Sequence, residues 1–465
     1  MIRHVSWRAL PLALLLVWAP LPFGSVSPAA SQALFLLTAL VAAGALLLPA
    51  PEAAGTLQAP PWPRFVAASL AALLAIGALA FVQSIAWTAG VARTIAPALA
   101  TYAEGGAALV DPGATLARAP LSLAPHSSRA AAFDWWLPLL AAIAALRLGA
   151  SRRVRRLLLG ALVAAAAIEI AIGVELWITR SNSLWGVTLA PFPGRLRGSF
   201  VNPNHLSLFL EIALVAIFAW LWWTVRRYWV SARRAEERLL RVGPAALAFL
   251  FVFAGIALTA SRAGILAAIA ALAVQGMLVG SRRGRTWVLA TGLGAALVGI
   301  GFVLVVGVEG ALGRLVSTPL GELGGGSRLQ AALATLDLWR ISPVTGVGLG
   351  AFRAAFPLVQ PESLAGLWRH AHSDWVELLA TAGVVGMGLL LFGLWSYVRR
   401  LRLVLADGES SEERAAGVAA AGALVVVGLH SFADFGLTMP ANALTLAVVL
   451  GAAAAARTRA AAAKG

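Results

Sequence analysis

Apolar residues run through the chain in long segments, and each segment is separated from the next by a shorter polar stretch. A helix needs about 20 apolar residues to cross a bilayer, so the chain has room for about 12 spans. Backbone polar groups in lipid must be bonded within the span, which favours helices. We therefore predict an all-α polytopic membrane protein. The predicted spans are residues 10–22, 29–49, 64–83, 133–148, 157–178, 205–224, 243–260, 263–280, 287–308, 374–397, 415–430 and 438–456.

Composition excludes a soluble domain, because 60% of the residues are hydrophobic and only 12% are charged. The chain has no cysteine, so neither a disulfide nor a thiolate nucleophile is possible. Arg3 and Arg8 precede a short apolar run, as in a signal peptide. That run leads into a proline-containing helix end and not into a small-residue cleavage site, so a first membrane span is the favoured interpretation.

The net charge of +16 would suggest nucleic acid in a soluble protein. Here the basic residues fall in alternate loops, which is the pattern of cytoplasmic loops in membrane proteins. We therefore predict that both termini are cytoplasmic and that the number of spans is even. The basic groups lie in residues 3–8, 147–156, 226–241, 282–285, 399–402 and 457–464.

One stretch, RHAHSDWVELLATAGVVG at residues 369–386, combines titratable groups with a membrane helix. His370, His372 and Asp374 stand at the mouth of the predicted span. An imidazole has an unperturbed pKa of about 6.5 and can accept a proton near pH 7. A histidine at this position is therefore a candidate general base.

A second polar cluster, PGRLRGSFVNPNHLSLFLE, occupies residues 193–211 on the non-cytoplasmic side. Arg195 and Arg197 depart there from the charge pattern of the loops. Proline disfavours helix in the residue before it, and Asn204 is expected to cap the next span. Glu211 falls about two turns into that span, so its side chain must face the interior of the bundle.

Two further connections on the same side carry polar residues. In LTASRAG, residues 258–264, two apolar segments meet with almost no loop, and Arg262 stands at the join. Its side chain either snorkels to lipid headgroups or forms a buried anion site, which we favour. His430 and Asp434 are one helical turn apart in HSFADFGLTMP, and we expect a structural bond between them more than a direct role.

The longest loop on this side, residues 309–373, contains apolar residues at helical spacing after Ser327. We predict a helix capped by Ser327 that covers residues 328–340 and lies on the membrane surface. The glycines of TGVGLGAF either offer amides to a phosphate or form a plain turn, which is favoured because no strand precedes them. The repeating apolar residues are Leu329, Ala332, Leu333, Leu336 and Trp339, and the glycines are Gly346, Gly348 and Gly350.

Metal and nucleophilic chemistry fit these residues poorly. On a helix His370 and His372 would point about 200° apart, and no further ligands stand at metal-site spacing. No serine lies in an elbow motif. Arginine holds phosphate through a fork of donors, and Arg195, Arg262 and Arg328 accompany the histidines. These residues suggest that a base deprotonates a hydroxyl while a phosphate of a lipid-linked donor departs.

At this point the sequence resembles the O-antigen ligase and polymerase family of bacterial envelope glycosyltransferases. His372 and Ser373 are followed by nine residues and then by Gly383 and Gly386, which is similar to the ligase signature. Three other segments resemble family motifs and occur in family order. They are Arg195-Leu-Arg-Gly198 with Asn202-Pro-Asn204, then Thr259-Ala-Ser261-Arg262, and then PVTGVGLGAF.

The resemblance implies a reaction without metal or other cofactor. His372 would activate an acceptor sugar hydroxyl, which attacks the anomeric carbon of an undecaprenyl-pyrophosphate-linked glycan with inversion. Arg195 and Arg262 would bind the pyrophosphate. The supporting residues would be Arg328, His370, Asp374 and Asn204.

The resemblance also implies a multi-pass protein of the bacterial inner membrane with its active site facing the periplasm. Its partners would be the lipid-linked donor, a glycan acceptor and membrane lipid, without nucleic acid. The prediction divides the chain into four parts. They are the N-terminal helices of 1–150 with a periplasmic loop at 84–132, the central helices of the ligase-like domain at 151–308, a large periplasmic loop at 309–373, and C-terminal helices at 374–465.

The loop at 84–132 is rich in proline, glycine, alanine and serine without sustained periodicity, so we expect irregular or partly helical structure. It would serve either as a lid at the substrate rim or as a tolerated insertion. The acceptor also stays open. A ligase would use lipid A core, a polymerase would use the next lipid-linked repeat, and a relative would glycosylate protein. We favour the ligase.

A rival from another class is a transporter or flippase of the same lipid-linked glycan. Such a protein would show internal repeats and helices broken near the bilayer midplane. No repeat is found, but Glu169, Glu175 and Glu211 lie inside predicted spans, as in a transport path. A third interpretation, a non-enzymatic assembly subunit, has support only from the amphipathic segment 328–340.

Overall fold

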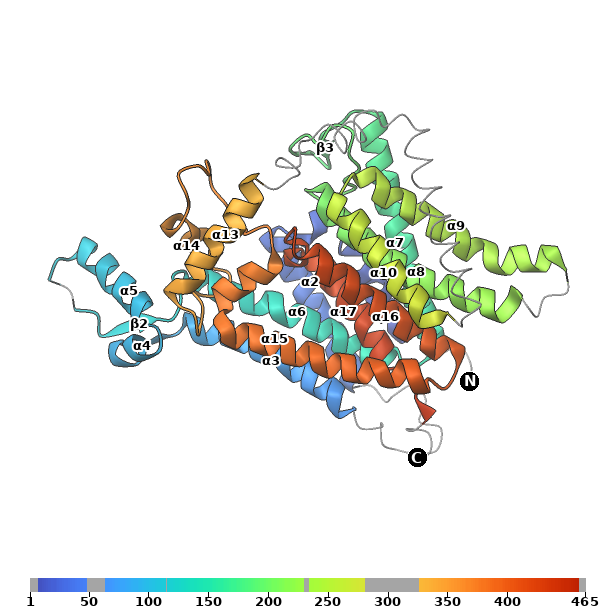
Figure 1. The fold of residues 1–465 in the computed structure, drawn as a ribbon, viewed down its shortest axis with the longest axis horizontal. Coiled ribbons are helices and arrows are strands. Elements are labelled where there is room, and N and C mark those ends of the chain that lie inside the picture. The colour runs from blue at the N-terminus through green and yellow to red at the C-terminus, as the bar shows by residue number, and fades with distance from the viewer. Residues whose placement is uncertain (1–6, 48–62, 114, 230–233, 281–325, 460–465) are drawn as a thin grey trace.

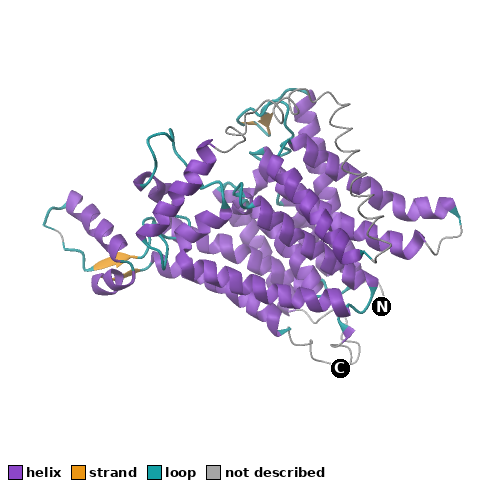
Figure 2. Cartoon of the chain, viewed as in Figure 1, coloured by secondary structure: helices purple, strands orange, loops and turns teal. Residues whose placement is uncertain are grey.

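The structure, a computed structural model, describes residues 7–47, 63–113, 115–229, 234–280 and 326–459. Within these ranges the regular secondary structure is helical, apart from two short antiparallel strand pairs, and loops connect the elements (Figure 2). Nine of the described helices are long and apolar enough to cross a membrane, which confirms an all-α polytopic membrane protein. They are α2 (Pro28–Leu47), α3 (Arg64–Ser84), α6 (Pro125–Leu148), α7 (Arg152–Ile178), α8 (Pro203–Thr224), α9 (Ala235–Thr259), α10 (Arg262–Val279), α15 (Asp374–Asp407) and α16 (Ser411–His430).

Two other predicted spans, 10–22 and 438–456, form shorter apolar helices, α1 (Leu10–Trp18) and α17 (Pro440–Ala454). The predicted span 287–308 lies outside the described residues. The total of about 12 spans and the cytoplasmic position of both termini therefore stay predictions. The short elements are η1 (Trp7–Ala9), η2 (Phe23–Ser25), β1 (Ala86–Thr88), α4 (Ala89–Ile95), α5 (Pro97–Val110), β2 (Arg118–Pro120), β3 (Ser183–Leu184), β4 (Val187–Thr188), η3 (Val225–Trp229), α13 (Gly326–Ile341), α14 (Phe352–Ala355), η5 (Phe356–Leu358) and η6 (Gly436–Thr438).

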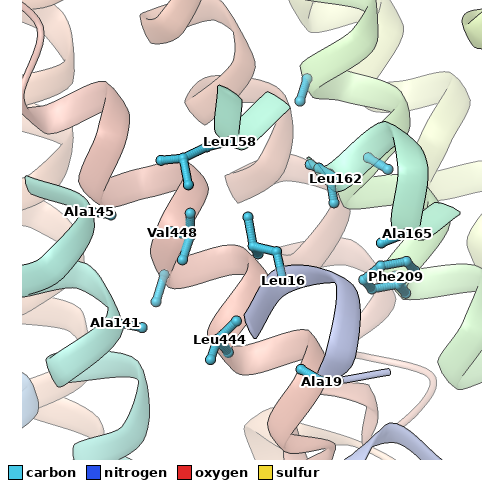
Figure 3. Packing of buried hydrophobic residues seen from close by; sticks show 14 of the residues in the cluster. Leu16, Ala19, Ala141, Ala145, Leu158, Leu162, Ala165, Phe209, Leu444 and Val448 are labelled. Carbon is cyan, nitrogen blue, oxygen red and sulfur yellow. The ribbon is translucent and has the colours of Figure 1, made fainter. Parts of the chain in front are cut away.

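Helix α8 lies at the centre of the bundle, and nearly every residue from Pro203 to Ala219 is buried. A helix that is apolar on all sides is suited to this position. Helices α7, α9, α10, α16 and α17 pack around it. Figure 3 shows part of the core, in which Phe209 of α8 lies beside Ala165 of α7, and Leu16 of α1 lies between these residues and Val448 of α17. Small residues let membrane helices approach closely.

The segment between α3 and α6 and the described part of the second predicted loop, residues 326–373, fold together into one unit at the left of Figure 1, called the outer unit below. The first loop forms α4, α5 and the antiparallel β1–β2 pair, so it is partly helical as predicted. Its Leu99 and Leu121 share a hydrophobic core with Leu338 and Phe352 of the second loop. The two loops therefore stabilise each other.

Helix α13 confirms the predicted helix, and its position on the membrane surface stays a prediction. It begins at Gly326, so Ser327 lies within its first turn and is not the cap. Two residues of the predicted apolar stripe face outward, because Leu329 is 59% and Leu333 is 55% exposed. Another stripe, made of small residues and one leucine, packs into the outer unit. Its residues are Ala331, Ala334, Thr335 and Leu338.

Helix α15 is interrupted at Gly383, whose φ of 64° and ψ of −167° leave the helical region. The segment 343–348 lies along this break, and the amide of Val384 donates to the carbonyl of Pro343 at 2.9 Å. In the other direction, the amide of Gly348 donates to the carbonyl of Thr381 at 3.0 Å. The predicted span 374–397 is confirmed within α15. Its break at Gly383 was not predicted, because a second chain segment takes over the backbone bonds there.

The glycines beside this break are needed for close backbone approach. A Cβ on Gly383 would lie 2.2 Å from the carbonyl oxygen of Val344, and one on Gly346 would lie 2.3 Å from the carbonyl carbon of Thr381. Gly346, Gly348 and Gly350 all have positive φ. Because the amide of Gly348 is already used within the protein, the turn interpretation of this segment agrees with the structure better than a phosphate cradle.

Replacement of Gly383 by alanine is expected to destabilise the protein. The side chain would meet backbone atoms and adopt an unfavourable φ, at a cost of roughly 1–3 kcal/mol. Thermal unfolding in detergent should show a melting temperature several degrees lower. Gly388→Ala is the matched control, because its Cβ would meet open space in the same helix. Equal melting temperatures for Gly383→Ala and the control would contradict this account.

Candidate active site

The polar motifs meet at one end of the helix bundle. Helices α8, α10 and α15 begin there, and α9 and α16 end there. The opposite end carries arginine and glutamate pairs, such as Arg156 Nη2 to Glu412 Oε2 at 2.8 Å and Arg155 Nη2 to Glu413 Oε1 at 2.7 Å. The two ends of the bundle therefore differ in chemistry, and the histidines lie at the end where α8, α10 and α15 begin.

His372 adopts a left-handed backbone conformation, with a φ of 54°. Non-glycine residues hold such angles only where the surroundings fix them, and they gather at functional sites. On one side the amide of Ala371 donates to Glu377 Oε2 at 2.8 Å, and on the other the hydroxyl of Ser373 donates to the carbonyl of Ser431 at 3.1 Å. The His372 side chain is 20% exposed, so it is held in place yet reachable.

Asp434 is the carboxylate that faces His372, and its side chain is 1% exposed. Its Oδ1 lies 3.6 Å from Nδ1 of His372, and its Oδ2 lies 3.9 Å from Nε2 of both His205 and His430. Burial alone raises the pKa of Asp434, but the imidazoles of His372 and His430 outweigh burial and hold that pKa well below its usual range. Asp434 is therefore an ionised group among three imidazoles.

The ring of Phe435 organises the histidines. It stacks on His370 with centroids 4.3 Å apart, and it meets His372 and His205 edge to face at 4.8 Å each. Trp368 adds an edge contact to His372 at 5.5 Å. His205 was missed by the sequence analysis, because it directly follows Asn204 and looks like the first turn of an apolar span.

His370 has a partner of its own in Glu377, with Nδ1 3.0 Å from Oε1. Burial of the imidazole lowers the pKa of His370, but the Glu377 carboxylate outweighs burial and raises that pKa above its ordinary value. His370 therefore faces Glu377, whereas His372 faces Asp434. Among the described residues, no group of three or more histidines, aspartates or glutamates is arranged to hold a metal ion.

Glu211 is fully buried in the bundle interior, as predicted. It accepts a hydrogen bond from the hydroxyl of Ser207 at 2.8 Å, and its two oxygens lie 3.0 and 3.1 Å from Nδ1 of His430. The expected pairing of His430 with Asp434 is present, with Nε2 3.9 Å from Oδ2 and the amide of Asp434 donating to the carbonyl of His430 at 3.1 Å. The shorter side-chain contact of His430 is with Glu211, which lies on a different helix.

Arg195 ties two of the sequence motifs together. Its Nε donates to the carbonyl of Thr259 at 2.8 Å, and its Nη2 donates to Oδ1 of Asn204 at 2.7 Å. The amide of Leu196 also donates to the carbonyl of Leu258 at 2.8 Å. The segment that carries Arg195 is therefore fixed against the turn that leads to Arg262.

Arg262 is the first residue of α10, directly after the capping residue Ser261. The start of α10 packs tightly against α8, because a Cβ on Gly264 would lie 2.1 Å from the hydroxyl oxygen of Ser207 and 2.4 Å from Oε1 of Glu211. Arg262 thus begins the turn of helix that covers Glu211. The predicted anion site stays a prediction.

Asn204 does not cap α8. Asn202 is the cap, and its side chain accepts from the amide of Asn204 at 2.9 Å. The Asn204 side chain is thereby left to accept from Arg195. Since His205 is next in the chain and lies beside Asp434, the contacts run from Arg195 through α8 to His372.

The other predicted supporting residues have different surroundings. Asp374 accepts from the hydroxyl of Ser431 at 2.8 Å and from the amide of Leu437 at 3.4 Å, so it joins α15 to the connection after α16. Arg328 lies at the start of α13 in the outer unit and makes no hydrogen bond or ion pair with the part of the chain that the structure describes. The structure therefore places Asp374 near the histidines, whereas Arg328 lies apart from them in the outer unit.

The pairing of His370 with Glu377 predicts a pH-dependent stability. Because the folded-state pKa of His370 is raised, its contribution is complete below the unfolded value of about 6.5 and is lost as the pH rises through the folded pKa. His370→Gln should therefore lower the free energy of unfolding more at about pH 6 than at about pH 9. The exposed His126→Gln is the control. An equal loss at both pH values would contradict this pairing.

Comparison with protein families agrees with the resemblance seen in the sequence. Residues 247–391 match the family model described as O-antigen ligase. That segment contains Arg262, His370, His372 and the break at Gly383. No curated protein matches the chain.

Proposed function

We propose that the chain, whose residues 247–391 match the family model described as O-antigen ligase, transfers a glycan from an undecaprenyl-pyrophosphate carrier to a sugar hydroxyl of lipid A core. The reaction takes place at the periplasmic face of the inner membrane. The observation that carries this proposal is the approach of His372 to the buried Asp434 at 3.6 Å, beside the segment that holds Arg195.

His372 acts as the general base. Its Nδ1 faces Asp434, so a proton on Nδ1 points to the carboxylate and Nε2 is left to accept the proton of the acceptor hydroxyl. Asp434 stabilises the imidazolium that forms. The distance of 3.6 Å exceeds that of a direct hydrogen bond, and such contacts commonly shorten when substrate binds.

The deprotonated oxygen attacks the anomeric carbon from the side opposite the pyrophosphate, which inverts the configuration. The new oxygen–carbon bond forms as the bond between that carbon and the phosphate oxygen breaks. The proton stays on His372 and the electron pair leaves with the pyrophosphate. Arg195 and Arg262 stabilise the charge of the departing group, as guanidinium groups do for phosphates. No metal is needed in this sequence of steps.

The surroundings of the intramembrane carboxylates support an enzyme over a flippase. Glu169 accepts from the amide and the hydroxyl of Ser199, each at 2.8 Å, and Glu211 is paired with His430. The break at Gly383 is also unlike a transport site. The carbonyl and amide groups around it are bonded to the segment 343–348 and to Gln83.

Loss of the base should abolish most transfer. Purified protein in detergent with EDTA is given an undecaprenyl-pyrophosphate glycan and lipid A core, and His372→Ala should reduce the rate about 10²- to 10⁴-fold. The exposed His126→Ala is the matched control, expected to keep the wild-type rate. Full activity of His372→Ala would contradict its role.

The acceptor and the rival function are tested in the same assay. Product with lipid-linked repeats alone would make the protein a polymerase of the same family. A wild-type protein that is inactive with every acceptor, yet moves the lipid-linked glycan across liposomes, would be a flippase.

Asp434 is a positioning residue, because it acts through His372. Asp434→Asn keeps the shape but removes the charge, and kcat should fall roughly 10- to 10³-fold with little change in KM for the donor. Asp337→Asn on the exposed face of α13 is the control. A rise in KM with an unchanged kcat would show that Asp434 serves substrate binding instead.

A further inference from the structure

A groove of about 810 Å³ lies between α1, α2 and the end of α6, apart from the histidine cluster. This volume is within the range of small-molecule sites, about 300–1,000 Å³. Most of its lining is aliphatic, including Leu14, Leu37 and Leu40, which are 58%, 44% and 69% exposed. The groove therefore presents an open apolar wall to its surroundings.

The charged residues among the described lining are both arginines, Arg8 and Arg147. Arg8 directly precedes α1 and Arg147 lies in the last turn of α6, so both stand at the same end of the groove. The Nε of Arg147 donates to the carbonyl of Ala45 at 3.4 Å, which fixes the guanidinium at the rim. Trp7 lies beside Arg8, with its ring 5.8 Å from the guanidinium carbon.

This arginine end is opposite to the histidine cluster. Helix α6 begins at the outer unit, where the amide of Leu123 donates to Val347, and Arg147 is at its other end. The far end of α1 leads to Pro20, which contacts the segment of Arg195. A pyrophosphate bound at Arg195 and Arg262 would thus be far from the arginine end of this groove.

We propose that the groove binds an anionic phospholipid, with its phosphate at Arg8 and Arg147 and an acyl chain along α1 and α2. Guanidinium forks suit phosphate, and no carboxylate among the described lining residues would repel it. Tryptophan and arginine together are typical of the membrane interface. Arginines near the cytoplasmic leaflet are attracted by its anionic lipids.

Occupancy of the groove would support the segment that carries Arg195. The connection after α1 accepts a hydrogen bond at Pro20 from the hydroxyl of Ser199 at 2.7 Å. Gly24 packs so closely on the ring of Phe200 that a Cβ there would lie 2.9 Å from it. A lipid that holds α1 against α2 therefore stabilises the surface on which residues 199 and 200 rest.

Lipid exchange followed by native mass spectrometry tests the site. Purified protein is stripped of lipid and offered phosphatidylglycerol or phosphatidylcholine with matched acyl chains. We expect retention of phosphatidylglycerol to be about tenfold greater, and the double variant Arg8→Ala/Arg147→Ala to remove this preference. Arg402→Ala is the matched control, since this exposed arginine of α15 does not line the groove.

A second variant tests the acyl part of the groove. Gly44 lines it, and a Cβ there meets nothing within 4 Å, so the side chain of Gly44→Leu starts in open space and takes up part of the groove. Retention of both lipids should fall while the melting temperature without lipid is unchanged. This variant decides the question even if the double arginine variant fails to fold.

Three results of the retention assay would overturn the proposal. They are equal retention of the two lipids by wild type, a loss of the phosphatidylglycerol preference in Arg402→Ala as large as in the double variant, and full lipid retention by Gly44→Leu. A rise in melting temperature with inorganic phosphate as large as that with phosphatidylglycerol would also overturn it, because the site would then bind an anion and not a lipid. Glycan transfer is not part of the readout, so this test is independent of the proposed function.

Discussion

A carboxylate that is buried in a membrane bundle needs a positive or hydrogen-bonding partner, because the loss of its hydration costs several kcal/mol. Asp434 has three imidazoles within 3.9 Å, and Glu211 accepts from Ser207 and lies 3.0 Å from Nδ1 of His430. These contacts join α8, α15 and α16 at one end of the bundle. The same contacts that make two buried charges tolerable also bring His372 to a fixed position, so stability and the proposed chemistry depend on one set of side chains.

Backbone hydrogen bonding imposes a similar requirement on α15. Its break at Gly383 exposes carbonyl and amide groups, and the segment 343–348 binds them. Gln83 completes the junction, since its amide nitrogen donates to the carbonyls of Thr345 and Thr381 at 2.6 and 3.0 Å. The glycines of both segments are needed because side chains would prevent this approach. The G-x-x-G pattern after His372 is thus explained by packing, at a place about two and a half helical turns beyond the start of α15.

Hydrophobic runs predicted most of the membrane helices, because a span is a property of local composition. The motifs also brought His372, Arg195, Arg262 and Asn204 into one hypothesis, and the structure shows that Arg195 and Asn204 are in contact. What the sequence did not predict depends on contacts between distant segments. His205 could be assigned to the site only once the start of α8 was known to lie beside Asp434. The choice between Asn202 and Asn204 as the cap of α8 depended on the direction of the Asn202 side chain. The small number of histidines, six in the chain, was the one available signal, since four of them gather around Phe435 or Asp434.

The outer unit has a consequence for protein engineering. Because Leu99 and Leu121 of one loop share a core with Leu338 and Phe352 of another, neither loop is an independent module. A chimaera that takes only one of them from a relative would place unmatched apolar surfaces against each other. Grafting of these loops therefore requires both to be transplanted together, although 176 residues of chain, 133–308, separate them.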